Sequence, residues 1–154
     1  MTGGAFLVGA KNFEDSGTTF SEKIVPPARA PDAVEEVPTS PFQSQLYRLS
    51  GDYNPLHISA DFAQMVGFKE PILHGLCTLG MSARGLLRAF AGNDPARFHS
   101  IKLRFSKPVI PGQTLRVEMW DEGDGRIVFQ TKVKETGAVV INNAVFRVRP
   151  GAKM

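Results

Sequence analysis

An acid and a histidine lie five positions apart in the segment SGDYNPLHISADFA, residues 50–63. Gly51 and Pro55 oppose an uninterrupted helix, and Asp-x-Asn-Pro is typical of a turn, which would bring Asp52 and His57 toward each other. A carboxylate and an imidazole held close together are a candidate general acid/base pair. The same two side chains can instead form a structural hydrogen bond within the turn, so the segment alone leaves both interpretations open.

Other polar residues near this pair have simpler interpretations. Asn54 either orients a bound water or substrate, or caps the turn through its own side chain. His74 is interpreted as a structural residue and His99 as an exposed one. Cys77 is interpreted as a small apolar residue, and as the only cysteine it leaves no intrachain disulfide and no cysteine-rich metal site.

The turn must be positioned by helices on both sides of it. Residues 42–49 fit a short helix, and residues 60–66 fit another with Ser59 as its N-cap. The longest predicted helix spans residues 76–90. Its apolar residues recur at the three-and-four spacing of one helical face: Leu76, Leu79, Ala83, Leu86, Leu87 and Phe90. Several small residues let other elements pack closely around this helix: Gly80, Ser82, Ala83 and Gly85.

Four later segments alternate apolar and polar residues, as half-buried strands do: 100–106, 114–120, 126–134 and 138–149. Turns at 111–112 and 122–125 are expected to join them into an antiparallel meander. Near the start, residues 18–26 fit a short strand, whereas the proline-rich residues 25–41 indicate a surface connection. One long helix followed by a meander predicts an α+β fold in which the sheet curls around the helix.

The composition is that of a globular domain, with 154 residues, 42% hydrophobic and 21% charged. The net charge of +3 is scattered along the chain, which argues against nucleic acid as a partner and is compatible with an anionic small molecule. No apolar run reaches the roughly 18 residues of a membrane span, so no membrane partner is expected.

Two segments, YRLSGDYNPLHISADFA and FKEPILHGLCTLG, resemble the MaoC-like (3R)-specific enoyl-CoA hydratases. The similarity is greatest to the hydratase portion of the peroxisomal D-specific multifunctional β-oxidation enzymes, and it extends through GGAFLVGAKNF near the start and IKLRFSKPVIPGQTL after the long helix. The resemblance implies the hot-dog fold, an antiparallel sheet wrapped around a central helix. It also implies reversible hydration of trans-2-enoyl-CoA to (3R)-3-hydroxyacyl-CoA, with the CoA thioester as substrate and neither a metal nor another cofactor.

The resemblance implies site residues as well. Asp52 and His57 become the catalytic pair that activates water, and Asn54 positions the water or the substrate. Gly75, just before the long helix, becomes the oxyanion-hole residue, because a helix N-terminus offers free N–H groups and glycine permits close approach. Lys102 and Arg104 are either solvated or contact the CoA phosphates. Four apolar residues are candidates for setting the depth of the acyl pocket: Phe62, Met65, Phe68 and Leu76.

The expected organisation is one MaoC-like domain, residues 1–154, with an extension and connection at 1–41, a catalytic core at 42–150 and a tail at 151–154. Eukaryotic members join two hot-dog units and the chain resembles the second, so it is either a homodimer or a fragment. A hot-dog thioesterase and a non-catalytic acyl-CoA-binding or partner subunit are alternative functions. The C-terminal Ala152-Lys153-Met154 is similar to a peroxisomal targeting tripeptide; otherwise a cytoplasmic location is expected.

Overall fold

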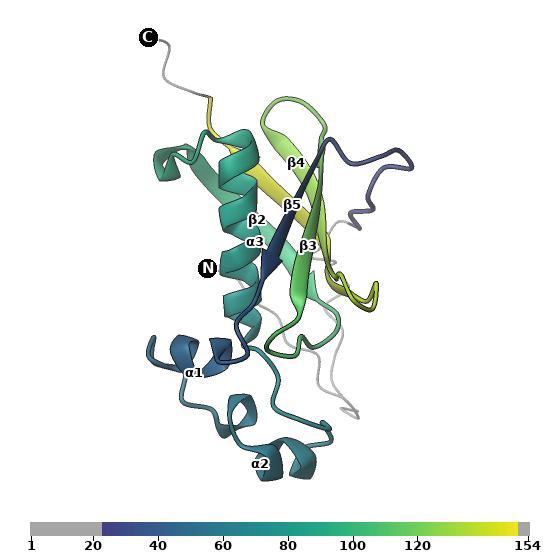
Figure 1. The fold of residues 1–154 in the computed structure, drawn as a ribbon. Coiled ribbons are helices and arrows are strands. Elements are labelled where there is room, and N and C mark those ends of the chain that lie inside the picture. The colour runs from purple at the N-terminus through teal and green to yellow at the C-terminus, as the bar shows by residue number, and fades with distance from the viewer. Residues whose placement is uncertain (1–22, 151–154) are drawn as a thin grey trace, which may run out of the picture.

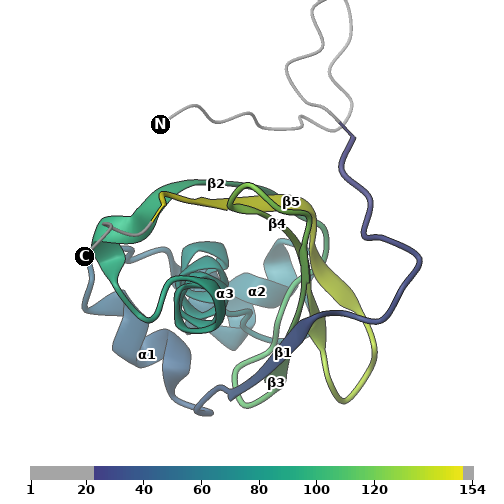
Figure 2. The same ribbon diagram turned by 90° about the horizontal axis from the view of Figure 1, so that it is seen from above.

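The structure, a computed structural model, describes residues 23–150. A five-stranded antiparallel sheet curls around one long helix, α3, while α1 and α2 lie beyond the N-terminal end of that helix (Figures 1 and 2). The elements are β1 Ala33–Pro38, α1 Gln43–Arg48, α2 Ala60–Met65, α3 Gly75–Phe90, β2 Phe98–Phe105, β3 Thr114–Asp121, β4 Arg126–Val133 and β5 Val139–Val148, with short 3₁₀ helices at Pro55–His57 and Pro95–Arg97. This arrangement confirms the predicted α+β class.

The strand order in the sheet is β1-β3-β4-β5-β2. Strands β3, β4 and β5 form the predicted meander, but β2 pairs with β5 and not with β3. The prediction of one continuous meander was therefore wrong for β2. Residues 106–113 cross from the edge strand β2 to β3, the strand beside the opposite edge, and the Leu73 N–H donates to the carbonyl of Val109 on the way. Alternation fixes which face of a strand is buried but does not fix its neighbours.

Strand β1 lies within the segment that was predicted to be a surface connection. It pairs antiparallel with β3, from Ala33 opposite Met119 to Pro38 opposite Thr114. Its charges and its proline are tolerated because β1 is an edge strand, and on one side its backbone needs no hydrogen-bonded neighbouring strand. The strand expected at 18–26 is absent from its described part, residues 23–26, where Ile24 instead packs with Trp120 on the outer face of the sheet.

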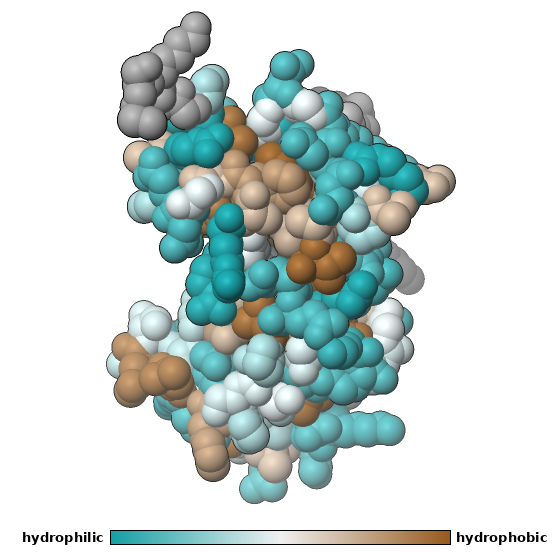
Figure 3. All heavy atoms as spheres, turned by 45° about the horizontal axis from the view of Figure 1, so that its top comes forward, coloured by the Kyte–Doolittle hydropathy of each residue, from teal (hydrophilic) through white to brown (hydrophobic). Residues whose placement is uncertain are grey.

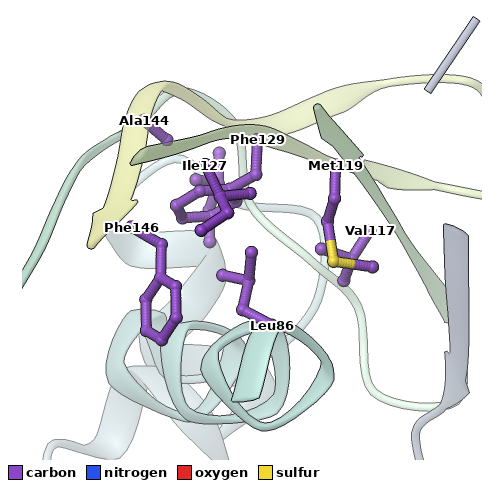
Figure 4. Packing of buried hydrophobic residues seen from close by; sticks show 8 residues of the cluster. Leu86, Val117, Met119, Ile127, Phe129, Ala144 and Phe146 are labelled. Atoms are coloured by element: carbon purple, nitrogen blue, oxygen red, sulfur yellow. The ribbon is translucent and has the colours of Figure 1, made fainter. Parts of the chain in front are cut away.

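The main core lies between the concave face of the sheet and the C-terminal half of α3. Leu86 points from α3 into the apolar side chains of the sheet (Figure 4). The cluster consists of Leu86, Val117, Met119, Ile127, Phe129, Ile141, Ala144 and Phe146. A second cluster, which includes Leu73, Cys77 and Val109, fills the end of the sheet near the start of α3.

The buried face of α3 coincides only in part with the predicted apolar face. Leu86 is fully buried, and Leu87 and Phe90 pack against the main core, whereas Leu76 is 56% exposed. The buried residues of α3 are Cys77, Thr78, Ser82, Gly85 and Leu86. The face is displaced because Ser82 hydrogen-bonds Thr131 Oγ1 on β4 at 2.9 Å, so a polar pair occupies a central position that hydrophobicity cannot identify.

The close packing expected around the small residues of α3 is found at Gly85. A Cβ at that position would lie 3.2 Å from the side chain of Glu35, so helix and edge strand approach closely there. The surface seen in Figure 3 is mostly hydrophilic with separate hydrophobic patches. Among residues 23–150, no helix is long and apolar enough to span a membrane.

Candidate active site

The segment from Gly51 to His57 forms the predicted turn. Gly51 has a φ of 107°, a left-handed conformation that favours glycine. Asp52 Oδ1 accepts from the Asn54 N–H at 3.3 Å, and Asn54 Oδ1 accepts from the Leu56 N–H at 3.0 Å. Asn54 is thus the N-cap of the 3₁₀ helix Pro55–His57, in agreement with the capping interpretation of this residue.

The imidazole of His57 has a defined orientation. The residue is only 8% exposed, and its Nδ1 lies 2.7 Å from the carbonyl oxygen of Ile72. Because a carbonyl only accepts, Nδ1 carries the hydrogen and Nε2 of the neutral ring keeps its lone pair. That nitrogen is able to accept a proton from a water molecule.

Asp52 and His57 lie close together, as predicted, and His74 lies with them. One polar side-chain atom from each of the three residues lies within 4.8 Å of the other two. Asp52 is exposed, whereas both histidines are buried. The turn therefore offers an exposed carboxylate beside a buried imidazole, which is a suitable arrangement for gripping and activating a water molecule.

The same three residues are a poor metal site, although each offers a ligand atom. The rings of His57 and His74 are stacked, with centroids 3.7 Å apart and planes 27° apart. A metal ion must lie near the plane of each imidazole that binds it, and two stacked rings cannot both direct a lone pair at one ion. Nδ1 of His57 and Nε2 of His74 also face backbone carbonyls, which leaves few free lone pairs.

His74 was predicted to be structural, and it contacts the candidate catalytic pair directly. Its Nε2–H donates to the carbonyl of Asp52 at 3.3 Å. Tyr47 of α1 lies on the ring at a centroid distance of 4.8 Å. Burial lowers the pKa of His74, so that the ring is neutral near pH 7.

Gly75 is the first residue of α3, with His74 as the N-cap, so the helix begins one position earlier than predicted. The first N–H groups of a helix have no carbonyl partner within it, and no described residue accepts from the Gly75 N–H. A Cβ at position 75 would lie 3.4 Å from Phe105 Cζ on β2. Glycine therefore keeps the space between this N–H and β2 open.

A cavity of about 340 Å³ lies between the start of α3 and the end of β2. His57 and Gly75 both line it, which places on one cavity a proton acceptor and an N–H that no described residue accepts from. Asp52 and Asn54 are not among its lining residues. Most of the remaining wall is apolar, including Phe68, Ile72, Phe105 and Val140, as suits an acyl chain.

The apolar residues predicted to set the depth of the acyl pocket do not all line the cavity. Phe68 lines the cavity, whereas Met65 is 72% exposed and Leu76 is 56% exposed, and neither lines it. Phe105 lines it without having been predicted to. Its place at the end of a strand gave no sign that it would meet Gly75, because that contact depends on how the sheet curls.

The two cations predicted near the substrate lie on β2, away from the cavity wall. Arg104 lines a separate hollow on the outer face with Lys23 and Asn142, and Lys102 lines neither. Lys107, just after β2, lines the cavity and was missed by sequence reasoning. The available signal was the break in alternation at Lys107, where a polar residue follows the polar Ser106.

Comparison with known proteins matches the chain to one family. A family model described as "MaoC like domain" matches residues 22–144. The chain is 57% identical over 151 residues to the peroxisomal multifunctional enzyme type 2 of Mus musculus, covering 96% of this chain and 20% of that protein. It is 46% identical over 145 residues to the peroxisomal enoyl-CoA hydratase 2 of Arabidopsis thaliana, covering 88% of this chain and 47% of that protein.

Solved structures show the same fold. A MaoC-like dehydratase from Phytophthora capsici superposes with a TM-score of 0.89 at 48% identity, covering 94% of this chain and 51% of that one. Full-length peroxisomal multifunctional enzyme type 2 from Drosophila melanogaster gives a TM-score of 0.81 at 52% identity, covering 88% and 25%. These matches confirm the predicted hot-dog fold. The chain spans between a fifth and about half of the length of these proteins.

Proposed function

Since the chain belongs to the MaoC-like domain family, we propose that it is a (3R)-specific enoyl-CoA hydratase. The reaction adds water reversibly to trans-2-enoyl-CoA and yields (3R)-3-hydroxyacyl-CoA. The observation that carries the proposal is that the His57 imidazole and the Gly75 N–H share one largely apolar cavity, with the Asp52 carboxylate beside the imidazole. The name of the Arabidopsis relative, enoyl-CoA hydratase 2, supports the same substrate class.

The chemistry follows from the positions of these groups. A water held between the Asp52 carboxylate and His57 Nε2 gives up a proton as its oxygen bonds to Cβ of the enoyl group. Electrons move toward the thioester oxygen, where the Gly75 N–H at the helix N-terminus stabilises the developing negative charge. Asp52 and His57 then return one proton to Cα, so the elements of one water molecule are added and the pair is regenerated. Asn54 contributes by holding the turn that carries both residues.

The cations around β2 are proposed to contact the CoA phosphates. Lys107 lines the cavity, and Lys102 and Arg104 lie on the strand just before it. Replacing Lys107 by Met is expected to raise KM for crotonyl-CoA about threefold to tenfold with little change in kcat, because a long-range attraction is lost while the reacting atoms stay in place. An unchanged KM in Lys107→Met and in Arg104→Met would remove these residues from the site.

We propose that the whole chain forms one domain and that it assembles as a homodimer. Strand β2 is an edge strand, and an unpaired edge favours association with another chain. Large apolar side chains around α1 are exposed as well, among them Phe42, Leu46 and Leu49. Light scattering on the purified chain tests this; a monomer at micromolar concentration contradicts it.

A peroxisomal location is proposed from the names of the relatives and from the C-terminal Ala152-Lys153-Met154, which lies outside the described residues. Fusing the last dozen residues to a fluorescent reporter tests the tail directly. Punctate fluorescence that coincides with a peroxisomal marker is expected, and diffuse fluorescence contradicts the proposal.

The activity is tested by the ultraviolet absorbance of crotonyl-CoA after the purified chain is added. Loss of the conjugated enoyl absorbance is expected, with a product that an R-specific dehydrogenase oxidises and an S-specific one does not. Release of free thiol would identify a thioesterase instead. Binding of crotonyl-CoA by folded protein without loss of absorbance would identify an acyl-CoA-binding subunit.

A further inference from the structure

His74 lies where three parts of the candidate active site meet. Its ring contacts the ring of Tyr47 from α1 and the ring of His57, at centroid distances of 4.8 Å and 3.7 Å. Its Nε2–H donates to the backbone carbonyl of Asp52. As the N-cap of α3 it directly precedes Gly75, and its own carbonyl accepts from the N–H groups of Cys77 and Thr78. One residue therefore touches or adjoins each group that the proposed reaction uses.

Packing alone does not explain an imidazole at this position. Only 1% of the residue is exposed, and Nδ1 has no hydrogen-bond partner among the described residues. Burying a polar atom without a partner costs free energy, so an apolar ring would fill the same space at lower cost. The feature that an apolar ring cannot supply is the Nε2–H that holds the carbonyl of Asp52.

We propose that His74 is a positioning residue that holds Asp52, His57 and Gly75 in one fixed arrangement. The proposal rests on the hydratase function proposed above and adds to it the group that sets the geometry. The hydrogen bond fixes the backbone from which the Asp52 side chain projects, and the stacked ring limits rotation of His57. The N-cap position sets where the first N–H of α3 points. His74 itself touches neither water nor thioester.

The neutral state of His74 is compatible with this role. Charging its ring would place a second positive charge 3.7 Å, centroid to centroid, from the imidazole that must accept a proton. Burial disfavours that charge, and it lowers the pKa of His74. A lysine or arginine could donate a similar hydrogen bond, but its fixed charge would oppose protonation of His57.

Two substitutions separate the hydrogen bond from the ring. His74→Phe keeps an aromatic ring for stacking and removes the donor, whereas His74→Gln removes the ring and keeps an N–H group at a similar distance from the backbone. His99→Phe is a matched control, because His99 is exposed on β2, away from the cavity. All variants are made in the full chain and compared by thermal unfolding.

We expect His74→Phe to lower kcat for crotonyl-CoA by about 30-fold while KM changes less than about threefold, because misplaced reacting groups lose rate more than binding. His74→Gln is expected to recover about a third or more of the wild-type kcat, because the donor is what positions Asp52. His99→Phe is expected to match the wild type. Wild-type kcat in His74→Phe overturns the proposal, and so does a loss that is equal in Phe and Gln variants and follows their loss of thermal stability.

A second readout does not depend on activity. The ¹³C chemical shift of the Asp52 carbonyl reports whether it accepts a hydrogen bond, and it is expected to move in His74→Phe and to return toward the wild-type value in His74→Gln. An Asp52 signal that is the same in all three proteins overturns the positioning role. If the wild-type chain fails to hydrate crotonyl-CoA, the proposed function is rejected, and this signal still decides whether His74 holds Asp52.

Discussion

At its C-terminal half, α3 buries Leu86 among the large apolar side chains of the sheet, whereas its N-terminal end carries His74, Gly75 and the half-exposed Leu76 beside an open cavity. The first region is a dry core in which shape and volume determine stability. The second contains a buried nitrogen and a backbone N–H that have no partner among residues 23–150, and an exposed carboxylate. One helix thus joins a region that stabilises the fold to a region whose polar groups are left available for a ligand.

The largest expected effect is on catalysis, at the N-terminal end. Asp52→Asn and His57→Ala are each expected to lower kcat for crotonyl-CoA hydration by about 10³-fold, because each removes a group that transfers protons in the transition state. Thermal unfolding should change little for Asp52→Asn, since that carboxylate is exposed. Initial rates at saturating substrate measure this; either variant turning over at more than a tenth of the wild-type rate would remove that residue from the mechanism.

The next effect is on stability, in the dry core. Leu86 is 0% exposed, and Leu86→Ala is expected to lower the free energy of unfolding by about 3 kcal/mol, because it removes buried apolar atoms and leaves a cavity. Chemical denaturation monitored by circular dichroism measures this loss. The kcat of the fraction that remains folded should be close to wild type. A catalytic loss as large as that of His57→Ala would show that the two regions are not separable.

A substitution at Gly75 is expected to move stability and activity in opposite directions. Alanine favours helices over glycine by up to about 1 kcal/mol, so Gly75→Ala should not lower the unfolding temperature. Its Cβ would point toward Phe105 and narrow the approach to the N–H, so kcat/KM should fall about tenfold or more. Paired measurements of kcat/KM and unfolding temperature test this. An unchanged kcat/KM would exclude the Gly75 N–H as the oxyanion donor.

The smallest effect is a pH dependence that arises on the outer face of the sheet. Burial raises the pKa of Glu118, but hydrogen bonds from Lys132, Gln130 and Arg116 outweigh it, and the net pKa lies below the ordinary value of 4.5. A lowered folded-state pKa stabilises the protein above the unfolded-state value and loses that contribution as the pH falls through the folded-state value. The unfolding temperature of the wild type should therefore fall as the pH falls below about 4.5.

Glu118→Gln separates this contribution from other acid effects. The variant should have a lower unfolding temperature at neutral pH and a shallower decline on acidification, because its side chain does not titrate. Its kcat should match the wild type, since Glu118 faces away from the cavity. A decline as steep as that of the wild type would show that Glu118 does not contribute to the acid sensitivity.

The sequence predicted the elements of the fold better than their arrangement. Alternation and capping located α2, α3 and the strands β2 to β5 within a few residues. They could not reveal that β2 pairs with β5 or that residues 33–38 form an edge strand, because neighbours in a sheet are chosen by tertiary contacts. The buried face of α3 was displaced for the same reason, since the bond between Ser82 and Thr131 joins residues distant in the chain.

The sequence likewise predicted some contacts of the candidate site and not others. The turn chemistry of Asp-x-Asn-Pro indicated that Asp52 and His57 would lie close together, and the structure places them so. The stack of His74 on His57 and the contact of Phe105 with Gly75 were not predictable, because both join segments that meet only when the sheet curls around the helix. The catalytic roles themselves remain predictions.

The proposed function requires that the N-terminal end of α3 hydrates enoyl thioesters with R stereochemistry through Asp52 and His57. The most direct test runs the reaction in reverse, by supplying (3R)- and (3S)-3-hydroxybutyryl-CoA separately and following the appearance of the enoyl absorbance with the wild type and with His57→Ala. We expect absorbance from the R substrate with the wild type alone. Absorbance from the S substrate, an equal rate with His57→Ala, or no absorbance from either substrate with folded wild-type protein would contradict it.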